Sequence, residues 1–138
     1  MIIDATDLIL GRMCAKVAKK AMLGETIQII NCEKALITGN KKDIIAKYRH
    51  RLELGQPQKG PYIQRKSDRF VRRTVRGMVP FKQEKGRAAF ERVMCYIGVP
   101  AAFKDKKTET IKEASIEKVP NLKYITVHEV CRQIGGKL

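Results

Sequence analysis

The fold class is decided by residues 2–31, IIDATDLILGRMCAKVAKKAMLGETIQIIN. Ile2 and Ile3 form a short apolar strand before a polar turn, and apolar residues then recur at helical spacing over 10–21. Residues 26–31 are compact and β-branched, which predicts a second strand. A strand, a helix and a strand within about 30 residues form a βαβ unit, whose strands pair in parallel through a right-handed crossover. The sequence therefore predicts an α/β fold.

The rest of the chain alternates between further helices and strands. We interpret the apolar run 93–97 as a strand rather than a continued helix, because it is short and Gly98 and Pro100 flank it. We find no internal repeat and no linker, so residues 1–138 are expected to form a single domain. The other expected elements are a strand at 35–38, a helix at 41–51, an irregular basic arm at about 52–67, helices at 69–79 and about 84–90, a strand at 124–127 and a helix ending at 134.

Composition narrows the class of protein. The chain has 138 residues, with 29 lysines and arginines against 14 aspartates and glutamates, a formal net charge of +15. About a quarter of the residues are Leu, Ile, Val or Phe, which excludes disorder for the chain as a whole. No apolar run approaches the roughly 18 residues of a membrane helix, and the N-terminus lacks a signal-peptide pattern. We therefore expect a soluble, intracellular protein whose charge attracts a polyanion.

Most of the excess positive charge lies in the middle of the sequence. Residues 41–92 contain 16 lysines and arginines and 5 aspartates and glutamates, a net charge of +11. Four of the arginines share one helical face, although like charges on such a face repel each other. Residues 65–76 contain five arginines and one lysine, and guanidinium groups suit bidentate phosphate contacts better than lysines do. This pattern favours a nucleic-acid contact over a merely solvated basic face. The four arginines are Arg69, Arg72, Arg73 and Arg76.

The expected polyanion is RNA. Membrane docking needs exposed aromatic residues beside a basic helix face, but the chain has no Trp and only four Phe and four Tyr. No helix-turn-helix or zinc-finger spacing indicates DNA, whereas a basic arm rich in glycine and proline suits folded RNA. If about ten phosphates are neutralised, the logarithm of affinity should fall with the logarithm of salt concentration at a slope of roughly −7 to −9. Because a non-specific binder shows the same slope, charge alone does not establish specificity.

Three carboxylates offer an alternative, catalytic interpretation. Asp4, Asp7 and Glu33 follow expected strands, where acidic side chains hold metal ions in some nucleases. Carboxylates at such positions more often cap turns and helices. The glycines before Arg12 and Lys41 match no phosphate-loop motif, so these two turns are equally compatible with an RNA phosphate contact and with plain turn formation.

Neither a metal ion nor a cofactor is expected. The four cysteines are separated by 18, 63 and 36 residues, so no C-x-x-C pair exists. His50 and His128 lack a second ligand at metal-binding spacing. Without an export signal, the cysteines are expected to be buried and reduced.

Several ordered motifs resemble the ribosomal protein L13 family of the large subunit. They are DAT with LGR (4–6 and 10–12), INCEK with ITGNK (30–34 and 37–41), and VRGMVP with GRA (75–80 and 86–88). Three further stretches resemble the archaeal branch of this family: KGP (59–61), RRTVRG (72–77) and the tail 124–136. The resemblance spans essentially the whole chain, which is far more specific than any one glycine pattern.

This resemblance implies a three-layer α/β/α domain around a small, mainly parallel, four-stranded sheet. It also implies a non-enzymatic, structural constituent of the large ribosomal subunit in the cytoplasm, which binds rRNA and neighbouring ribosomal proteins and needs no membrane or small-molecule substrate. An RNA-processing or RNA-modifying enzyme and an off-ribosome translational regulator remain the alternatives. The expected RNA contacts are Arg12, Lys41, Lys42, Arg49, Arg51, Lys59, Arg65, Lys66, Arg69, Arg72, Arg73, Arg76, Lys82, Lys85 and Arg87.

Overall fold

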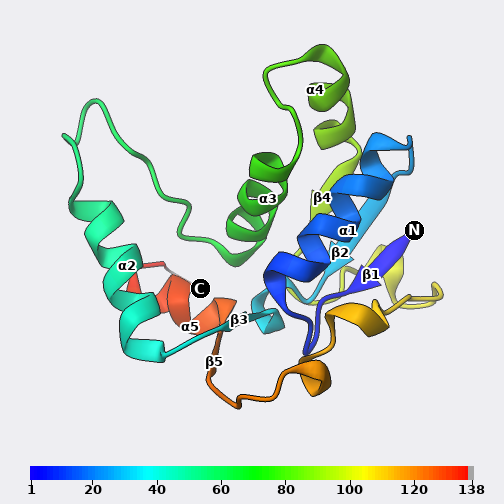
Figure 1. The fold of residues 1–138 in the computed structure, drawn as a ribbon. Coiled ribbons are helices and arrows are strands. Elements are labelled where there is room, and N and C mark those ends of the chain that lie inside the picture. Colours follow the sequence, from blue (N-terminus) through cyan, green and yellow to red (C-terminus); the bar gives the residue numbers. More distant parts are fainter. Residues whose placement is uncertain (137–138) are drawn as a thin grey trace.

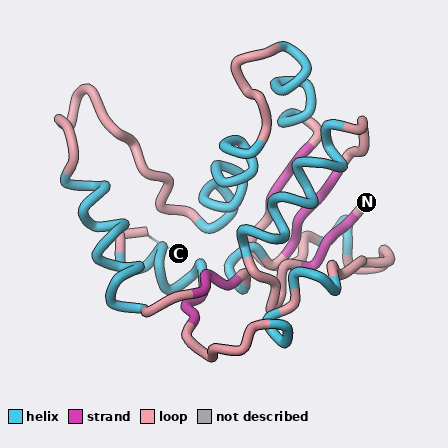
Figure 2. The backbone as a smooth tube through the Cα atoms, viewed as in Figure 1, coloured by secondary structure: helices cyan, strands magenta, loops and turns pink. Residues whose placement is uncertain are grey.

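The computed structural model describes residues 1–136 and contains an α/β fold (Figures 1 and 2). The strands are β1 (Ile2–Asp4), β2 (Ile27–Ile30), β3 (Leu36–Thr38), β4 (Val93–Cys95) and β5 (Tyr124–Thr126). The helices are α1 (Leu10–Met22), α2 (Lys41–Glu53), α3 (Ser67–Met78), α4 (Glu84–Glu91) and α5 (Val127–Gln133). The predicted βαβ unit, the strand after α4 and the strand-to-helix tail are thereby confirmed.

Three strands form a parallel sheet in the order β1-β2-β4. Ile3 lies opposite Ile29, which lies opposite Cys95, so these side chains point to the same side of the sheet. That side is fully buried in a core shared with the apolar faces of α1 and α3. The opposite side carries Gln28 and Met94, which remain partly exposed, and Ile30, which is buried. On the first side of the sheet, α1 packs against α3 and α4.

The expected single sheet of four strands is wrong. β3 and β5 form a separate antiparallel pair in which Ile37 lies opposite Ile125. After β2 the backbone of Asn31 takes a left-handed conformation, with φ of 53°, and enters a short 3-10 helix, so β3 leaves the parallel sheet. Each of these strands has three residues, and so short a pattern predicts a strand without specifying its partner.

The irregular basic arm is slightly shorter than predicted, because α2 continues to Glu53 and α3 begins at Ser67. The arm therefore comprises residues 54–66. Its tip forms a tight turn in which the backbone N–H of Gly60 donates to the carbonyl of Gln56 at 2.9 Å. Its far end packs so closely on Gly136 that a Cβ at that glycine would lie 2.3 Å from the carbonyl oxygen of Arg65. In Figure 1 the arm extends from α2 and returns to α3, on the same side of the molecule as α4.

Candidate nucleic-acid interface

Helix α3 separates an apolar face from a basic face. Phe70, Val71 and Val75 are buried, and this side of the helix packs against α1. Two of its arginines, Arg69 and Arg73, are exposed. Residues three and four apart share a helical face, so burying the apolar positions turns the arginines outward. The predicted grouping of the four arginines is thus a direct consequence of how α3 packs.

The other two arginines of α3 are half-buried and held against aromatic rings. The Nε–H of Arg72 donates to the backbone carbonyl of Val93 at 3.0 Å, and its guanidinium carbon lies 4.5 Å from the centroid of the Phe90 ring. The guanidinium carbon of Arg76 lies 4.0 Å from the centroid of the Phe81 ring. Such contacts are worth about 0.5–2 kcal/mol each and orient the guanidinium groups before any ligand arrives.

These side chains surround a hollow of about 480 Å³ on the surface of α3 and α4. We call it the arginine hollow. It is lined by Gln64, Arg69, Arg72, Arg73, Arg76, Phe81 and Phe90. Within residues 1–136, no carboxylate forms an ion pair with any of its four arginines. Asp68 stands four residues before Arg72 in α3, but its Oδ1 is buried without a hydrogen-bond partner. The hollow therefore concentrates positive charge that the described part of the chain leaves uncompensated.

Further predicted cations lie on the arm and on α4 with its preceding loop. Lys82, Lys85 and Arg87 are exposed on α4 and the loop before it. Lys59, Arg65 and Lys66 are exposed on the arm. Figure 1 shows the arm and α4 on either side of α3.

Two other predicted RNA-contact residues lie away from the arginine hollow. Arg12 lies on the outer face of α1, in a hollow that also contains Lys16, Lys19 and Glu113. The Nζ of Lys41 lies 3.6 Å from Glu129 of α5. These residues do not join the arginine hollow.

The cations of α2 are all exposed, and besides Lys41 two of them contact other side chains. Arg49 donates to the side-chain oxygen of Gln133 at 2.9 Å. Arg51 lies 5.5 Å from the Tyr48 ring and lines a second groove, which faces the arm. Lys42, at the start of the helix, is exposed without a contact to the arginine hollow.

Phe81, Phe90 and Gln64 were missed by sequence reasoning. The two rings meet edge to face, with centroids 5.4 Å apart, and together they support Arg72 and Arg76. The sequence carried one usable signal, since both phenylalanines interrupt a strongly basic stretch. Their partners, however, are set by how α4 folds back onto α3.

Two of the three carboxylates of the catalytic alternative, Asp4 and Glu33, have structural roles, whereas Asp7 is exposed. Asp4 Oδ1 accepts hydrogen bonds from the backbone N–H and hydroxyl of Thr6, at 3.0 and 2.7 Å, and from the Asn31 amide at 3.0 Å. Burial by itself would raise the pKa of Asp4, but these hydrogen bonds outweigh it and hold the pKa below its ordinary value. Glu33 accepts from the backbone N–H of Gly98 at 3.1 Å. Within residues 1–136, no three histidines, cysteines or acidic residues are grouped to hold a metal ion.

The cysteines follow the prediction that they are buried. Cys14, Cys32, Cys95 and Cys131 are all free thiols inside the core. Burial raises the pKa of Cys131 to about 11, so this thiol stays protonated and unreactive at neutral pH.

Among the helices described, none has both the length and the apolar character needed to cross a membrane.

Comparison with known proteins identifies the family. The family model for ribosomal protein L13 matches residues 1–102. The chain is 42% identical to large ribosomal subunit protein uL13 of Archaeoglobus fulgidus, over 97% of this chain and 86% of that one. It is also 42% identical to the protein of the same name from Methanosarcina barkeri, over 99% of this chain and 98% of that one. The chain belongs to the ribosomal protein L13 family.

Proposed function

We propose that this protein is a structural constituent of the large ribosomal subunit and that it binds rRNA through the arginine hollow and the cations beside it. The observation that carries the proposal is the grouping of four α3 arginines around one hollow without an acidic partner in the described part of the chain. Membership of the L13 family and the name shared by its archaeal relatives support the ribosomal assignment. The protein then works in the cytoplasm, within the ribosome, and is not an enzyme.

The arrangement of the hollow explains how binding would be achieved. RNA phosphates supply the negative charge that the hollow lacks. Each guanidinium group can donate two parallel hydrogen bonds to one phosphate. Arg72 and Arg76 rest on aromatic rings, so they lose little rotamer freedom when a phosphate binds. Arg69 and Arg73 are exposed and more adaptable. Two fixed and two adaptable cations suit a folded RNA that is recognised by its shape and phosphates.

The proposed ribosomal role also covers protein partners, domain organisation and secondary RNA contacts. Neighbouring ribosomal proteins are expected to contact the surfaces that rRNA leaves free. Residues 1–138 act as one domain, since a single buried cluster draws side chains from Ile3 in β1 to Cys131 in α5. The cations outside the arginine hollow, including Arg12 and Lys42, bind rRNA as secondary contacts.

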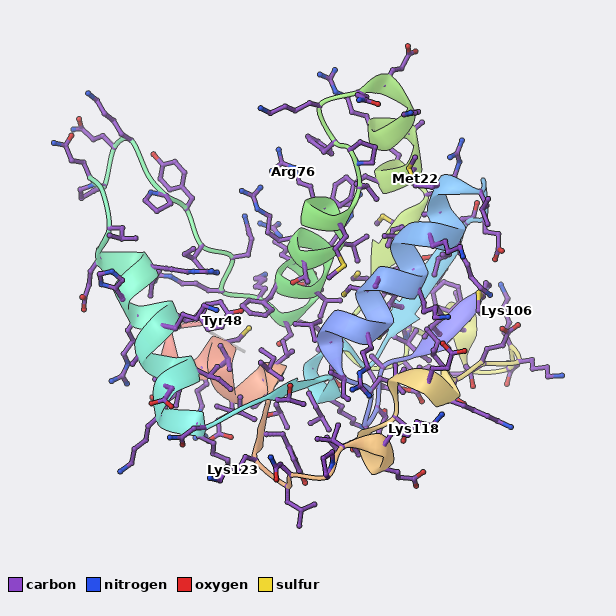
Figure 3. The ribbon with its side chains drawn as sticks, viewed as in Figure 1. Met22, Tyr48, Arg76, Lys106, Lys118 and Lys123 are labelled. Carbon is purple, nitrogen blue, oxygen red and sulfur yellow. The ribbon has the colours of Figure 1, made fainter. Side chains whose placement is uncertain are left out.

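A charge-matched pair of variants tests the proposed RNA surface. Each variant replaces three exposed cations by Gln, one set from α3 and α4 that includes two arginines of the hollow, and the other set at the right and bottom of Figure 3, away from Arg76. Binding to protein-free large-subunit rRNA is measured as a function of salt. The hollow variant should bind more weakly, with a salt slope flatter by about 2–3. The hollow variant changes Arg69, Arg73 and Arg87. The control variant changes Lys106, Lys118 and Lys123.

Equal losses in the two variants would contradict the proposed surface, because they would show that only total charge matters.

The ribosomal role has its own test. In a cell extract at moderate salt, the protein should sediment with large subunits, and the hollow variant should shift toward the soluble fraction. A wild-type protein that stays soluble would overturn the ribosomal assignment.

A further inference from the structure

A second groove, of about 770 Å³, separates the arm from α2 and α3. Its size is within the range of sites that bind small organic ligands. Arg51 and Tyr48 line it from α2, Tyr62 from the arm, and Arg73 from α3. Figure 3 shows Tyr48 on the side of α2 that faces α3. The groove shares Arg73 with the arginine hollow, so it continues the proposed RNA surface toward the arm.

Tyr62 is the unusual residue of this groove. This residue is 65% exposed, whereas the other three tyrosines of the chain are half-buried. The Tyr62 hydroxyl donates to the carbonyl of Gln58 at 2.6 Å, and the ring lies against Gly60. The ring therefore lies along the arm's own turn. Among the described residues no aromatic ring or cation stacks on Tyr62, so an apolar face of this ring is available to a ligand.

The α2 side of the groove is apolar and is packed against the core. The Tyr48 ring packs on the Phe70 ring with centroids 5.2 Å apart, and Phe70 belongs to the buried core. Burial raises the pKa of Tyr48, although the neighbouring Arg51 opposes this, so the phenol stays neutral at physiological pH. The two tyrosines thus provide one packed wall and one exposed wall.

The charge in the groove favours an anion. Arg51 and Arg73 stand on different helices, and none of the described residues that line the groove is acidic. Gln64 adds an amide, which both donates and accepts hydrogen bonds. An exposed ring, a mixed hydrogen-bonding group and two guanidinium groups correspond to the three parts of a nucleotide: the base face, the base edge and the phosphate.

We propose that this groove holds one unstacked nucleotide of the bound RNA, with its base on Tyr62 and its phosphate between Arg51 and Arg73. This inference rests on the proposed rRNA-binding function and adds a contact that reads single-stranded rather than paired RNA. Proteins recognise unpaired bases by stacking them on aromatic rings, which duplex RNA does not permit. The nucleotide must therefore come from a bulge, a loop or a strand end.

Variants at Tyr62 separate stacking from charge. In the full-length protein, Tyr62→Leu removes the π face but keeps an apolar side chain, and Tyr62→Phe keeps the ring and removes only the hydroxyl. Affinity for protein-free large-subunit rRNA is measured across a salt series. Loss of one stacked base weakens binding by about tenfold. We expect that loss for Tyr62→Leu with an unchanged salt slope, and a loss of no more than about twofold for Tyr62→Phe.

Small probes identify which part of the nucleotide binds. Adenosine monophosphate and ribose 5-phosphate are titrated separately into the ¹⁵N-labelled protein, and NMR shifts are followed at Tyr62, Gln64 and Arg73. The proposal requires a stronger response to adenosine monophosphate, which Tyr62→Leu abolishes. Equal responses to both probes would show a phosphate site only and would overturn the stacking.

The outcomes distinguish this inference from the proposed function. If wild-type protein binds rRNA with a steep salt slope and Tyr62→Leu binds equally well, the groove proposal fails and the rRNA-binding function stands. If wild-type protein does not bind rRNA, both fail. If both Tyr62 variants lose affinity equally and circular dichroism shows intact helices, the hydroxyl rather than the ring face is required, and stacking is again overturned.

Discussion

Arg72 and Arg73 are adjacent in the sequence but perform different work in the structure. Arg72 donates to the carbonyl of Val93 in β4 and stacks on Phe90 of α4, so it joins three elements. Arg73 is exposed and lines both the arginine hollow and the groove beside the arm. A helix turns by about 100° per residue, which is enough to place one arginine against the protein and the next toward solvent.

The neighbouring pair supports a direct prediction. Arg72→Gln should lower the free energy of unfolding by about 1–2 kcal/mol, because it removes a hydrogen bond and a cation–π contact. Arg73→Gln should change stability by less than about 0.5 kcal/mol and flatten the salt slope of rRNA binding by about 1. Urea denaturation and salt-dependent binding measure the two effects. Equal destabilisation by both variants would refute the division of roles.

Asp4 makes a second residue-scale prediction. Its carboxylate joins the ends of β1 and β2 by accepting from Thr6 and Asn31. Because its pKa in the folded protein is below the ordinary value of 3.8, the charged form stabilises the fold above that pH. This contribution is lost as the pH falls through the folded-state pKa.

We therefore expect Asp4→Ala to destabilise the protein by about 1–2 kcal/mol at pH 7, discounted for partial exposure. The difference from wild type should shrink steadily below pH 4. Urea titrations at pH 7, 5 and 3 provide the measurement. A difference that stays constant across this range would mean that Asp4 acts through shape and not through its charge.

At the scale of elements, the position of α4 depends on a close backbone approach. A Cβ at Gly86 would lie 2.1 Å from the carbonyl oxygen of Pro80, so no larger residue fits unless α4 moves. Gly77 near the end of α3 has no atom within 4 Å of the corresponding point. Since α4 supplies Phe90 and adjoins Phe81, its docking sets the geometry of the arginine hollow.

These two glycines should respond in opposite ways to alanine. Gly77→Ala should leave the protein as stable or raise stability by up to about 1 kcal/mol, because alanine favours the helix. Gly86→Ala should lower stability by about 1–3 kcal/mol through steric strain and weaken rRNA binding as well. Thermal unfolding of the two variants decides the point. A Gly86→Ala protein with the wild-type Tm would show that α4 tolerates displacement.

At the scale of the whole molecule, the positive charge is one-sided. Residues 41–92 carry +11 of the net +15, and α2, the arm and α3 each carry +3 of it. The lysines after β4 are interspersed with acidic residues and project from other parts of the surface (Figure 3). A one-sided protein is expected to bind RNA on one side and leave the other available to proteins.

Limited proteolysis tests this one-sided arrangement. In the free protein, trypsin should cut after Lys59 at the exposed tip of the arm and after Lys106 or Lys107 in the exposed loop following β4. With large-subunit rRNA bound, the arm site should be protected while the loop site is still cut. Mass spectrometry of the fragments reports both. Protection of Lys59 before RNA is added would contradict a freely accessible arm.

The sequence by itself determined the class of the fold and pointed to the RNA ligand that we propose. Periodicity over 2–31 predicted the βαβ unit because it depends only on which side chains must be buried together. Charge counting located the basic region, since charge is additive along a chain. The arginine spacing also predicted one basic face on α3.

Only the tertiary structure decided which strands pair and which arginines are fixed. β5 joins β3 and not the parallel sheet, although the two strands are separated by more than eighty residues. Arg72 is anchored by Val93 and Phe90, and Tyr62 stays exposed beside Arg73, because α2, α4 and the arm fold back onto α3. Local patterns record burial and charge at each position, whereas pairing, anchoring and grooves depend on contacts between distant parts of the chain.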